Sequence, residues 1–257
     1  MNITRSRWFK AVRQPQRIAE VARCFRTVRN NQLALSRAYI TASGIEYPYT
    51  VVLRDGRALP LHDFYDLTTF WLIFMTETYV IGSADRVIID AGANIGAFTL
   101  YAAPQPGSRI IAIEPFPPTF ARLQATVTAN RLSNVQCVNA ALGAEEGLAY
   151  MGTIDEPSQF RAVTESGEQA VRVTTLQTIF DQNNVDEVDL LKIDIEGGEY
   201  KSLLTADIPT LRRIRRIALE YHPGPKQDLF DHLSKVFSCE LDRPDGNGYG
   251  IAAFHRR

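Results

Sequence analysis

From Val87 to Tyr101 the chain reads Val-Ile-Ile-Asp-Ala-Gly-Ala-Asn-Ile-Gly-Ala-Phe-Thr-Leu-Tyr, and this segment decides the fold. Its apolar run ends in Asp90, the chain then passes Gly92 and Gly96, and apolar residues resume at helical spacing. This order predicts a strand, a tight turn and a helix. Glycine lets the backbone of such a turn approach a ligand closely, so the segment predicts a nucleotide cradle.

The spacing of the turn residues limits the ligand. A dinucleotide fingerprint places glycines as Gly-x-Gly-x-x-Gly around a pyrophosphate, whereas this turn reads Asp-x-Gly-x-Asn-x-Gly with Ala93 inside it. The pattern therefore argues against NAD. Asp90 is placed to meet a positive or hydrogen-donating group, and S-adenosylmethionine has a positively charged amino-acid end. The residues favour S-adenosylmethionine as cofactor.

Strands and helices alternate along the rest of the chain. We expect strands over 109–114, 135–139, 171–174, 188–194 and 214–220, helices over 117–131 and 176–180, and a closing hairpin from 237–241 and 249–254. Such alternation predicts a parallel sheet with helices on both faces. Residues 143–170 break the rhythm and predict a mobile, partly hairpin insertion.

Four acids follow or end the expected strands, namely Asp90, Glu114, Asp194 and Glu220. Because ligands of such sheets lie beyond the carboxyl ends of the strands, we expect these acids to converge on one rim. Glu114 is the most diagnostic of them, because a carboxylate at the end of the second strand can accept both ribose hydroxyls of a nucleoside.

The neighbours of Glu114 predict the rest of a nucleoside site. Pro115 and Phe116 could form a wall beside the adenine. Asn139 follows the next strand, where its amide and the main chain of residues 139–142 could read the adenine edge.

A second dense motif runs from Leu190 to Tyr200. Glu196 and Glu199 flank a Gly-Gly turn at the start of a helix, and Lys192 within the strand must reach a partner, because an unpaired buried ammonium is costly. The last strand brings Glu220 and His222 to the same rim. His222 is as consistent with a structural role as with a catalytic one.

Composition sets the broad class of the protein. The chain has 257 residues, 45% of them hydrophobic, which is enough for one main core. Three scattered cysteines suggest neither disulfides nor a zinc site and are typical of a reducing compartment. No apolar run is long enough to span a membrane and no signal core is seen, so the sequence predicts a soluble, cytoplasmic protein.

Residues 1–45 are expected to form a basic helical arm and residues 46–257 the main domain. The first 40 residues hold nine Lys or Arg and one acid, Glu20, while the net charge of the whole chain is −1. Apolar residues at helical spacing after Pro15 predict an amphipathic helix that packs on the body or on a second copy, or else contacts a membrane surface or a polyanion.

Between the arm and the cradle the sequence predicts two further elements. Residues 49–61, with Asp-Gly at the turn, are expected to form a hairpin. Residues 63–80 predict an aromatic helix, which favours core packing. The alternative is that this helix and the 143–170 insertion form a lid over a substrate.

These motifs resemble the FkbM-type methyltransferases. The resemblance is carried by residues 87–96, Ile-Glu-Pro at 113–115, Asn-Ala-Ala-Leu-Gly at 139–143, Leu-Lys-Ile-Asp-Ile-Glu-Gly-Gly-Glu at 191–199 and Glu-Tyr-His at 220–222, and it covers about residues 45–255. It implies a class I, Rossmann-like fold with seven strands, the last antiparallel, and usually O-methylation of a small natural product, sugar or glycan.

The resemblance also implies site residues. The cofactor would be lined by Asp90, Gly92, Asn94, Gly96, Glu114 and Ala140, with Asp194 at the junction with the acceptor. Together with the residue-based expectations above, the cofactor set is completed by Pro115, Phe116, Asn139 and Leu142. Nothing implies specific binding of nucleic acid.

Two chemical questions stay open at this level. His222, with an ordinary pKa of about 6.5, is the favoured general base, with Asp194 or Glu220 orienting it or the acceptor. The competing mechanism is a Mg²⁺ ion held by those carboxylates, although no dedicated ligand cluster stands out. The main alternative to an enzyme is a catalytically silent scaffold module that binds partners through the basic arm.

Overall fold

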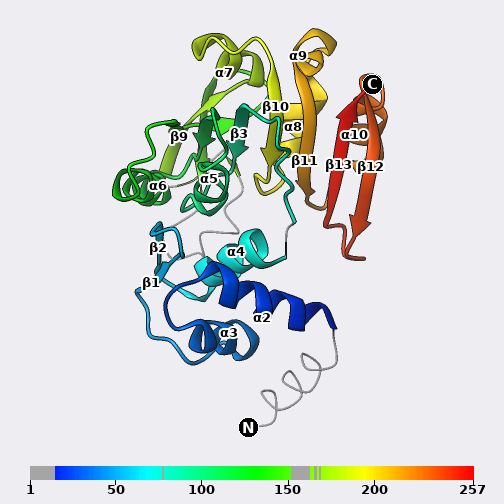
Figure 1. Ribbon diagram of the computed structural model, residues 1–257. Coiled ribbons are helices and arrows are strands. Elements are labelled where there is room, and N and C mark those ends of the chain that lie inside the picture. Colours follow the sequence, from blue (N-terminus) through cyan, green and yellow to red (C-terminus); the bar gives the residue numbers. More distant parts are fainter. Residues whose placement is uncertain (1–14, 77, 152–162, 165–166, 168) are drawn as a thin grey trace. The chain divides into compact units, whose positions relative to one another are not determined.

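The structure is a computed structural model that describes residues 15–76, 78–151, 163–164, 167 and 169–257. The chain divides into two compact units (Figure 1). One contains the chain up to Val80 together with Thr126–Arg131, and the other contains Ile81–Ala125 and Leu132–Arg257. The division falls after the hairpin and the aromatic helix, rather than at residue 45.

The first unit consists of helices and one hairpin. Its elements are α2 (Pro15–Thr27), α3 (Gln32–Thr41), β1 (Tyr49–Val52), β2 (Ala58–Leu61) and α4 (Phe64–Met75). β1 and β2 pair antiparallel, which confirms the predicted hairpin. No helix among the described residues has both the length and the apolar character needed to cross a membrane.

The aromatic helix α4 is mainly a core element of this unit. Asp63 caps it by accepting hydrogen bonds from the backbone of Tyr65 and Asp66, and the helix ends at Met75, before the predicted residue 80. Phe70 and Trp71 are fully buried. Trp71 stacks on Tyr39 with ring centroids 4.4 Å apart, so the preference for core packing is confirmed.

The basic helix α2 buries only part of its apolar stripe. Cys24 and Val28, the residue directly after the helix, are buried in the unit, whereas Ile18 and Phe25 are 67% and 43% exposed. Ile18 and Phe25 are seven residues apart and therefore lie on the same side of the helix. The side that they share is not covered by the described part of the chain.

The second unit is built on a seven-stranded sheet. The strands are β3 (Val87–Ala91), β4 (Arg109–Ile113), β5 (Val135–Val138), β10 (Val188–Ile193), β11 (Ile214–Tyr221), β12 (Phe237–Pro244) and β13 (Gly250–Arg256). Their order is β12-β13-β11-β10-β3-β4-β5. β13 runs in the direction opposite to the other six strands of this sheet, so the predicted mostly parallel sheet with an antiparallel strand from the closing hairpin is confirmed.

Helices connect the strands and cover the sheet (Figure 1). They are α5 (Ala97–Ala102), α6 (Pro117–Ala129), α7 (Leu176–Gln182), α8 (Gly198–Thr205), α9 (Ile208–Arg212) and α10 (Lys226–Leu233). The chain moves from β3 through β4 to β5 in one direction and from β10 to β11 in the other. Since such crossovers are right-handed, the two sets of helices cover opposite faces. The strand order reverses between β3 and β10, where ligands of such sheets bind.

The sheet is held by buried, branched apolar side chains. Ile89 of β3, Ile111 of β4, Leu191 and Ile193 of β10 and Ile217 of β11 form part of one core cluster. Strands covered on both faces carry continuous apolar runs, which is why the polar residues of β3 and β10 stand out.

A smaller sheet of order β6-β9-β7-β8 replaces the regular alternation around the predicted insertion. It consists of β6 (Ala141–Leu142), β7 (Gly147–Met151), β8 (Val163–Thr164) and β9 (Gln169–Thr174). The antiparallel pairing of β7 with β8 and β9 agrees with the expected hairpin character. Residues 152–162, 165–166 and 168 of the predicted lid segment 143–170 lie outside the described residues.

Candidate active site

The turn after β3 is shaped by its glycines. Gly92 has φ 74°, and a Cβ built on it would lie 1.8 Å from the carbonyl oxygen of Asp194. Glycine is therefore required because the end of β10 packs directly against the turn, in addition to any approach of a ligand. Asn94 also has positive φ, 50°, and Gly96, at 87°, precedes the first turn of α5.

Asp90 meets a positive group that belongs to the chain itself. Its side chain is fully buried, with Oδ1 3.3 Å from Nζ of Lys192, and Oδ2 accepts a hydrogen bond from Thr99 at 2.6 Å. Lys192 also donates to the carbonyl oxygen of Gly92 at 2.8 Å. Asp90 and Lys192 face each other in the β3–β10 register. Asp90 is therefore the partner that buried Lys192 was predicted to need. Through Lys192, Asp90 helps to hold the turn after β3 in place.

Glu114 lies at the end of β4, beside the same turn. It is 7% exposed, and its two oxygens accept hydrogen bonds from the backbone of Asn94 and of Phe116, each at 3.0 Å. Burial raises the pKa of Glu114 to about 7, although the two backbone donors and Lys192 act in the opposite direction. A carboxylate held in this way has further acceptor capacity for hydroxyl groups.

The residues expected beside an adenine are mostly packed into the protein. Nδ2 of Asn139 donates to the carbonyl oxygens of Glu114 and Pro115, both at 2.9 Å, so the amide group fixes the chain after β4. Phe116 is buried in a small cluster with Ala141 and others. Ala140 and Leu142 are buried as well.

His222 is held by two carboxylates at the end of β11. Its Nε2 lies 3.1 Å from Glu196, and its Nδ1 lies 3.1 Å from the fully buried Glu199. Glu199 also accepts the backbone N–H of His222 at 2.8 Å. Tyr200 donates its hydroxyl to the carbonyl oxygen of His222, and the ring of Tyr249 stands edge-on to the imidazole at 5.4 Å.

This pairing changes the expectation for His222. Burial by itself would lower its pKa, but the hydrogen bonds and charges of Glu196 and Glu199 outweigh that effect and raise the pKa to about 11. The ring is then an imidazolium at neutral pH and has no lone pair with which to take a proton. A general base at neutral pH needs a pKa near 7, so the raised pKa of His222 disfavours that role for it.

Asp194 lies between the Asp90–Lys192 pair and His222 with its two glutamates. Its backbone N–H donates to Ala91 across the switch point at 3.1 Å, and its Oδ2 is 3.8 Å from Nζ of Lys192. The carboxylate is 28% exposed. Burial raises its pKa, with the nearby charge of Glu196 acting in the same direction and Lys192 opposing it. Asp194 is thus a partly accessible carboxylate of increased basicity.

The donor set does not fit a Mg²⁺ site in this arrangement. Asp194, Glu220 and His222 each offer an atom, and these atoms lie within 4.8 Å of one another. However, both ring nitrogens of His222 already face glutamate oxygens. The carboxylates of Asp194 and Glu220 remain as possible ligands. The cluster found among the described residues adds no further oxygen ligand to these two.

The turn does fit a cofactor with hydrogen-donating groups. Oδ1 of Asn94 is buried and has no hydrogen-bond partner among the described residues. A buried acceptor without a donor costs free energy, which a ligand's N–H or O–H group would recover. Asn94 and Glu114 meet through a hydrogen bond of 3.0 Å, so one ligand could contact both side chains.

Comparison with known proteins agrees with this geometry. The family model of the methyltransferase FkbM domain matches residues 90–243 of this chain, which include the turn, Glu114, Asp194 and His222. The chain belongs to the FkbM methyltransferase family. Its fold and family are those of S-adenosylmethionine-dependent methyltransferases.

Relatives of this family show the extent of the similarity. "Methyltransferase 1" of Beauveria bassiana is 30% identical over 67% of this chain and 81% of its own length. The 31-O-demethyl-FK506 methyltransferase FkbM of Streptomyces tacrolimicus is 27% identical over 53% of this chain and 65% of its own. The crystal structure of methyltransferase FkbM from Methylobacillus flagellatus KT matches 93% of this chain with 16% identity and a TM-score of 0.49. This chain spans 58% of that one.

Sequence reasoning missed three members of the site. Thr99 supports Asp90, Tyr200 binds the backbone of His222, and Tyr249 contacts its ring. Thr99 and Tyr200 lie within the two motifs, near the starts of the helices α5 and α8, and this position was the signal that the sequence offered. Tyr249 comes from the turn before β13, and only the pairing of β13 with β11 brings it to His222.

Proposed function

We propose that this protein transfers a methyl group from S-adenosylmethionine to a hydroxyl oxygen of a small natural product, sugar or glycan. The observation that carries the proposal is the partly exposed carboxylate group at the strand ends. Asp194, Glu196 and Glu220 are half-buried there, beside the turn that fits the cofactor. Carboxylates accept hydrogen bonds from hydroxyl groups, and a net negative site disfavours phosphorylated or carboxylated acceptors.

The proposed cofactor contacts divide between the turn and β4. Asn94 offers its buried oxygen and Glu114 its carboxylate, while Gly92 and Gly96 provide the backbone shape. S-adenosylmethionine, when bound, supplies an activated methyl group on a sulfonium. The task left to the chain is to align the acceptor oxygen and remove its proton.

Asp194 is the base that we propose for this proton. It is partly exposed at the switch point, and burial raises its pKa toward the working range of a general base. Lys192 holds the turn to the strand end and limits the movement of Asp194. His222, as an imidazolium between Glu196 and Glu199, holds the loop after β10 through these two carboxylates.

The name of a relative supports the oxygen acceptor. The Streptomyces tacrolimicus protein is called a 31-O-demethyl-FK506 methyltransferase, so one member of the family is named for O-methylation.

For the basic arm, we propose that the uncovered side of α2, with Ile18 and Phe25, contacts a second copy or another surface.

Product analysis tests the function. The protein is incubated with isotope-labelled S-adenosylmethionine and pools of hydroxylated acceptors, and the products are identified by mass. Asp194→Asn should lower kcat by about 10²–10⁴-fold, because a general base contributes about that much. Asp228→Asn, which changes an exposed acid of α10, is the matched control and should be unaffected.

Three outcomes would change the proposal. Full activity of Asp194→Asn with loss of activity in His222→Asn would return the base to His222. Loss of activity in EDTA, restored by Mg²⁺, would show a metal-dependent mechanism despite the poor donor set. Methylation of nitrogen or carbon only would exclude the O-methyltransferase assignment.

A further inference from the structure

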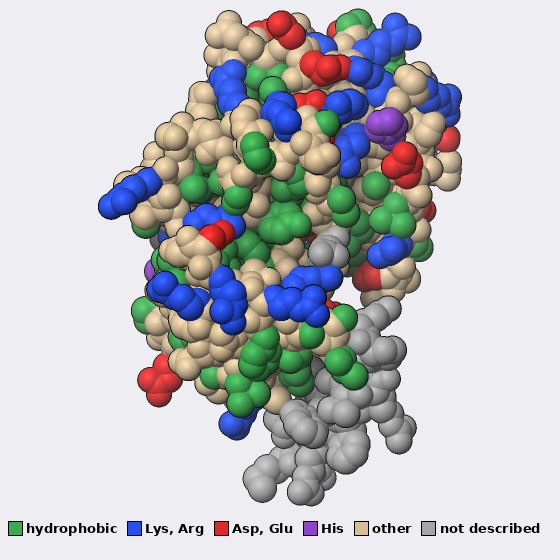
Figure 2. Space-filling model, viewed as in Figure 1, with side chains coloured by type: hydrophobic (Ala, Val, Ile, Leu, Met, Phe, Trp, Pro, Cys, Tyr) green, Lys and Arg blue, Asp and Glu red, His purple; other side chains and the backbone are tan. Residues whose placement is uncertain are grey.

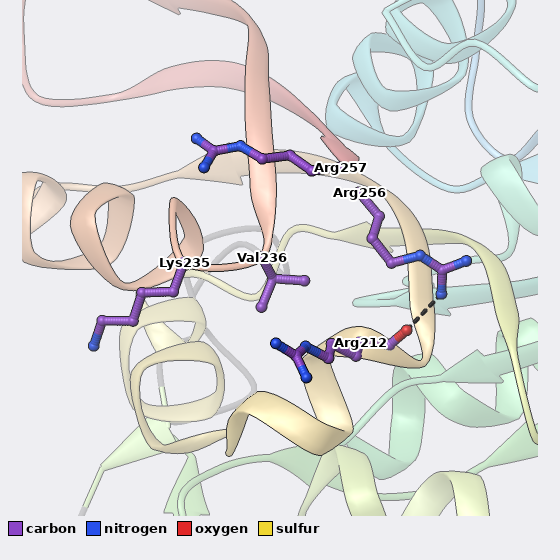
Figure 3. A pocket seen from close by; sticks show the side chains of 5 residues that line it. All are labelled: Arg212, Lys235, Val236, Arg256 and Arg257. Atoms are coloured by element: carbon purple, nitrogen blue, oxygen red, sulfur yellow. Dashed lines mark hydrogen bonds between the residues drawn. The ribbon is translucent and has the colours of Figure 1, made fainter.

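A pocket lined by cationic side chains lies at the other end of the sheet from the proposed active site. It has a volume of about 390 Å³ and is lined by Arg212, Lys235, Val236, Arg256 and Arg257. Figure 3 shows the four cationic residues placed around Val236, and they come from the end of α9, the segment between α10 and β12, and the end of β13. Figure 2 shows Lys and Arg side chains gathered over this part of the surface.

The backbone around the pocket is well anchored. The N–H of Arg257 donates to the carbonyl oxygen of Val236 at 3.1 Å, and the N–H of Val236 donates to Leu233 at 3.0 Å. Arg256 uses its guanidinium to bind the carbonyl oxygen of Arg212 (Figure 3). The positive charges therefore stand on segments that are fixed to one another.

The positive charge of the pocket is only partly compensated by the protein. Arg256 pairs with Glu187 at 2.6 Å. For Arg212, Lys235 and Arg257, the described residues provide no ion-pair partner, and Arg257 donates to the hydroxyl of Ser238. Like charges held around one cavity repel each other, and an anion in the cavity would relieve this repulsion.

The position of the pocket separates it from the cofactor and the acceptor. Arg212 precedes the first residue of β11, Ile214, whereas Glu220 and His222 stand at the other end of that strand. Eight residues of strand span about 23 Å at roughly 3.3 Å per residue. One small ligand cannot occupy both places, so a ligand of this pocket would be a second ligand.

We infer that this pocket binds a small phosphate-bearing anion. Guanidinium groups match the geometry of phosphate oxygens, lysine adds a mobile point charge, and the volume falls in the range of small-ligand pockets. The inference does not depend on the proposed function, because none of the pocket residues belongs to the catalytic or cofactor set.

Calorimetric titration of the full chain with inorganic pyrophosphate at about physiological ionic strength tests the inference. We expect saturable one-to-one binding. Arg212→Ala and Lys235→Ala should each weaken it by about tenfold, because each removes a charge-assisted contact. Arg243→Ala, an exposed arginine of β12 outside the pocket, is the matched control and should bind pyrophosphate normally.

Further measurements separate the pocket from general charge effects. S-adenosylhomocysteine affinity and the thermal unfolding curve should be the same in all three variants, since these side chains are peripheral to the core. Equal weakening by Arg243→Ala would mean diffuse attraction and would overturn the inference. The absence of saturable pyrophosphate binding would also overturn the inference. This holds even if the protein binds vesicles of anionic lipid.

Discussion

At Glu114, burial and hydrogen bonding act on one carboxylate in opposite directions. Burial prevails and raises its pKa to about 7. Because the pKa in the folded state lies above that of an exposed glutamate, this group stabilises the free protein most below about pH 4.5, and that contribution is lost as the pH rises through 7. The ionised form is the one that would accept two ribose hydroxyls.

We therefore expect the affinity for S-adenosylhomocysteine to increase as the pH rises from 6 to 8. Glu114→Gln should weaken binding at pH 8 by about tenfold or more, since a hydrogen bond to a charged group is worth about 1.5–3 kcal/mol, and should remove the pH dependence. Calorimetry at several pH values measures both effects. A variant with unchanged affinity would place the ribose elsewhere.

A second prediction about a single residue concerns the ionisation of His222. Its pKa of about 11 lies above the ordinary value of 6.5, so its pairing stabilises the protein fully below pH 6.5, and this contribution is lost as the pH rises through 11. NMR of the ring nitrogens should show an imidazolium up to at least pH 9. A midpoint near 6.5 would contradict the pairing and restore the argument for a general base.

Removing the imidazole should also destabilise the protein. His222→Ala leaves Glu199 fully buried without its charged partner, and breaking a buried ion pair costs about 3 kcal/mol or more. Thermal unfolding at pH 7 measures this loss. His255→Ala, which removes an exposed histidine of β13, is the matched control and should change stability little.

At the scale of elements, the turns at the switch point depend on two glycines in different ways. Gly92 and Gly197 both have positive φ, 74° and 93°. A Cβ on Gly92 would meet the backbone of Asp194, whereas a Cβ on Gly197 would meet nothing within 4 Å. Gly197→Ala should therefore cost only the conformational strain, about 1–2 kcal/mol.

Gly92→Ala should cost clearly more than Gly197→Ala and should reduce binding of S-adenosylhomocysteine. The added methyl group forces β10 away from the turn, which also separates Lys192 from the carbonyl oxygen of Gly92. Thermal unfolding and calorimetry of the two variants give the comparison. Equal stability of both variants would show that the contact between Gly92 and Asp194 is not as close as described.

Most elements followed from local patterns, and the exceptions have identifiable causes. The strands around the cradle were predicted within a residue or two, because they are continuous apolar runs ending in acids. Helices α3, α9 and α10 were not predicted. α9 has five residues, α10 eight and α3 ten, so their patterns are too short to separate from loops. α9 is nevertheless capped by Asp207, a signal that was present in the sequence.

At the scale of the whole molecule, the residues proposed for the cofactor all belong to the unit formed by Ile81–Ala125 and Leu132–Arg257. We expect S-adenosylhomocysteine alone to slow amide hydrogen exchange at 91–97, 113–116 and 139–143, as measured by mass spectrometry. Slowing at Phe64–Met75 and 152–162 only after acceptor is added would support the lid hypothesis. Protection confined to residues 15–80 would contradict the proposed cofactor site.

The sequence by itself determined the class of fold, the family and the rim on which the acids meet. The fold class and the rim depend on local periodicity and on the rule that parallel strands present their carboxyl ends together, whereas the family was indicated by the resemblance of the motifs. The tertiary structure decided what each charged group does. Asp90 is occupied by Lys192 because the register of β3 and β10 places them side by side, and His222 is an imidazolium because the turn after β10 brings Glu196 and Glu199 to it. A pKa depends on burial and on neighbours that are distant in sequence, and only the folded chain brings these together.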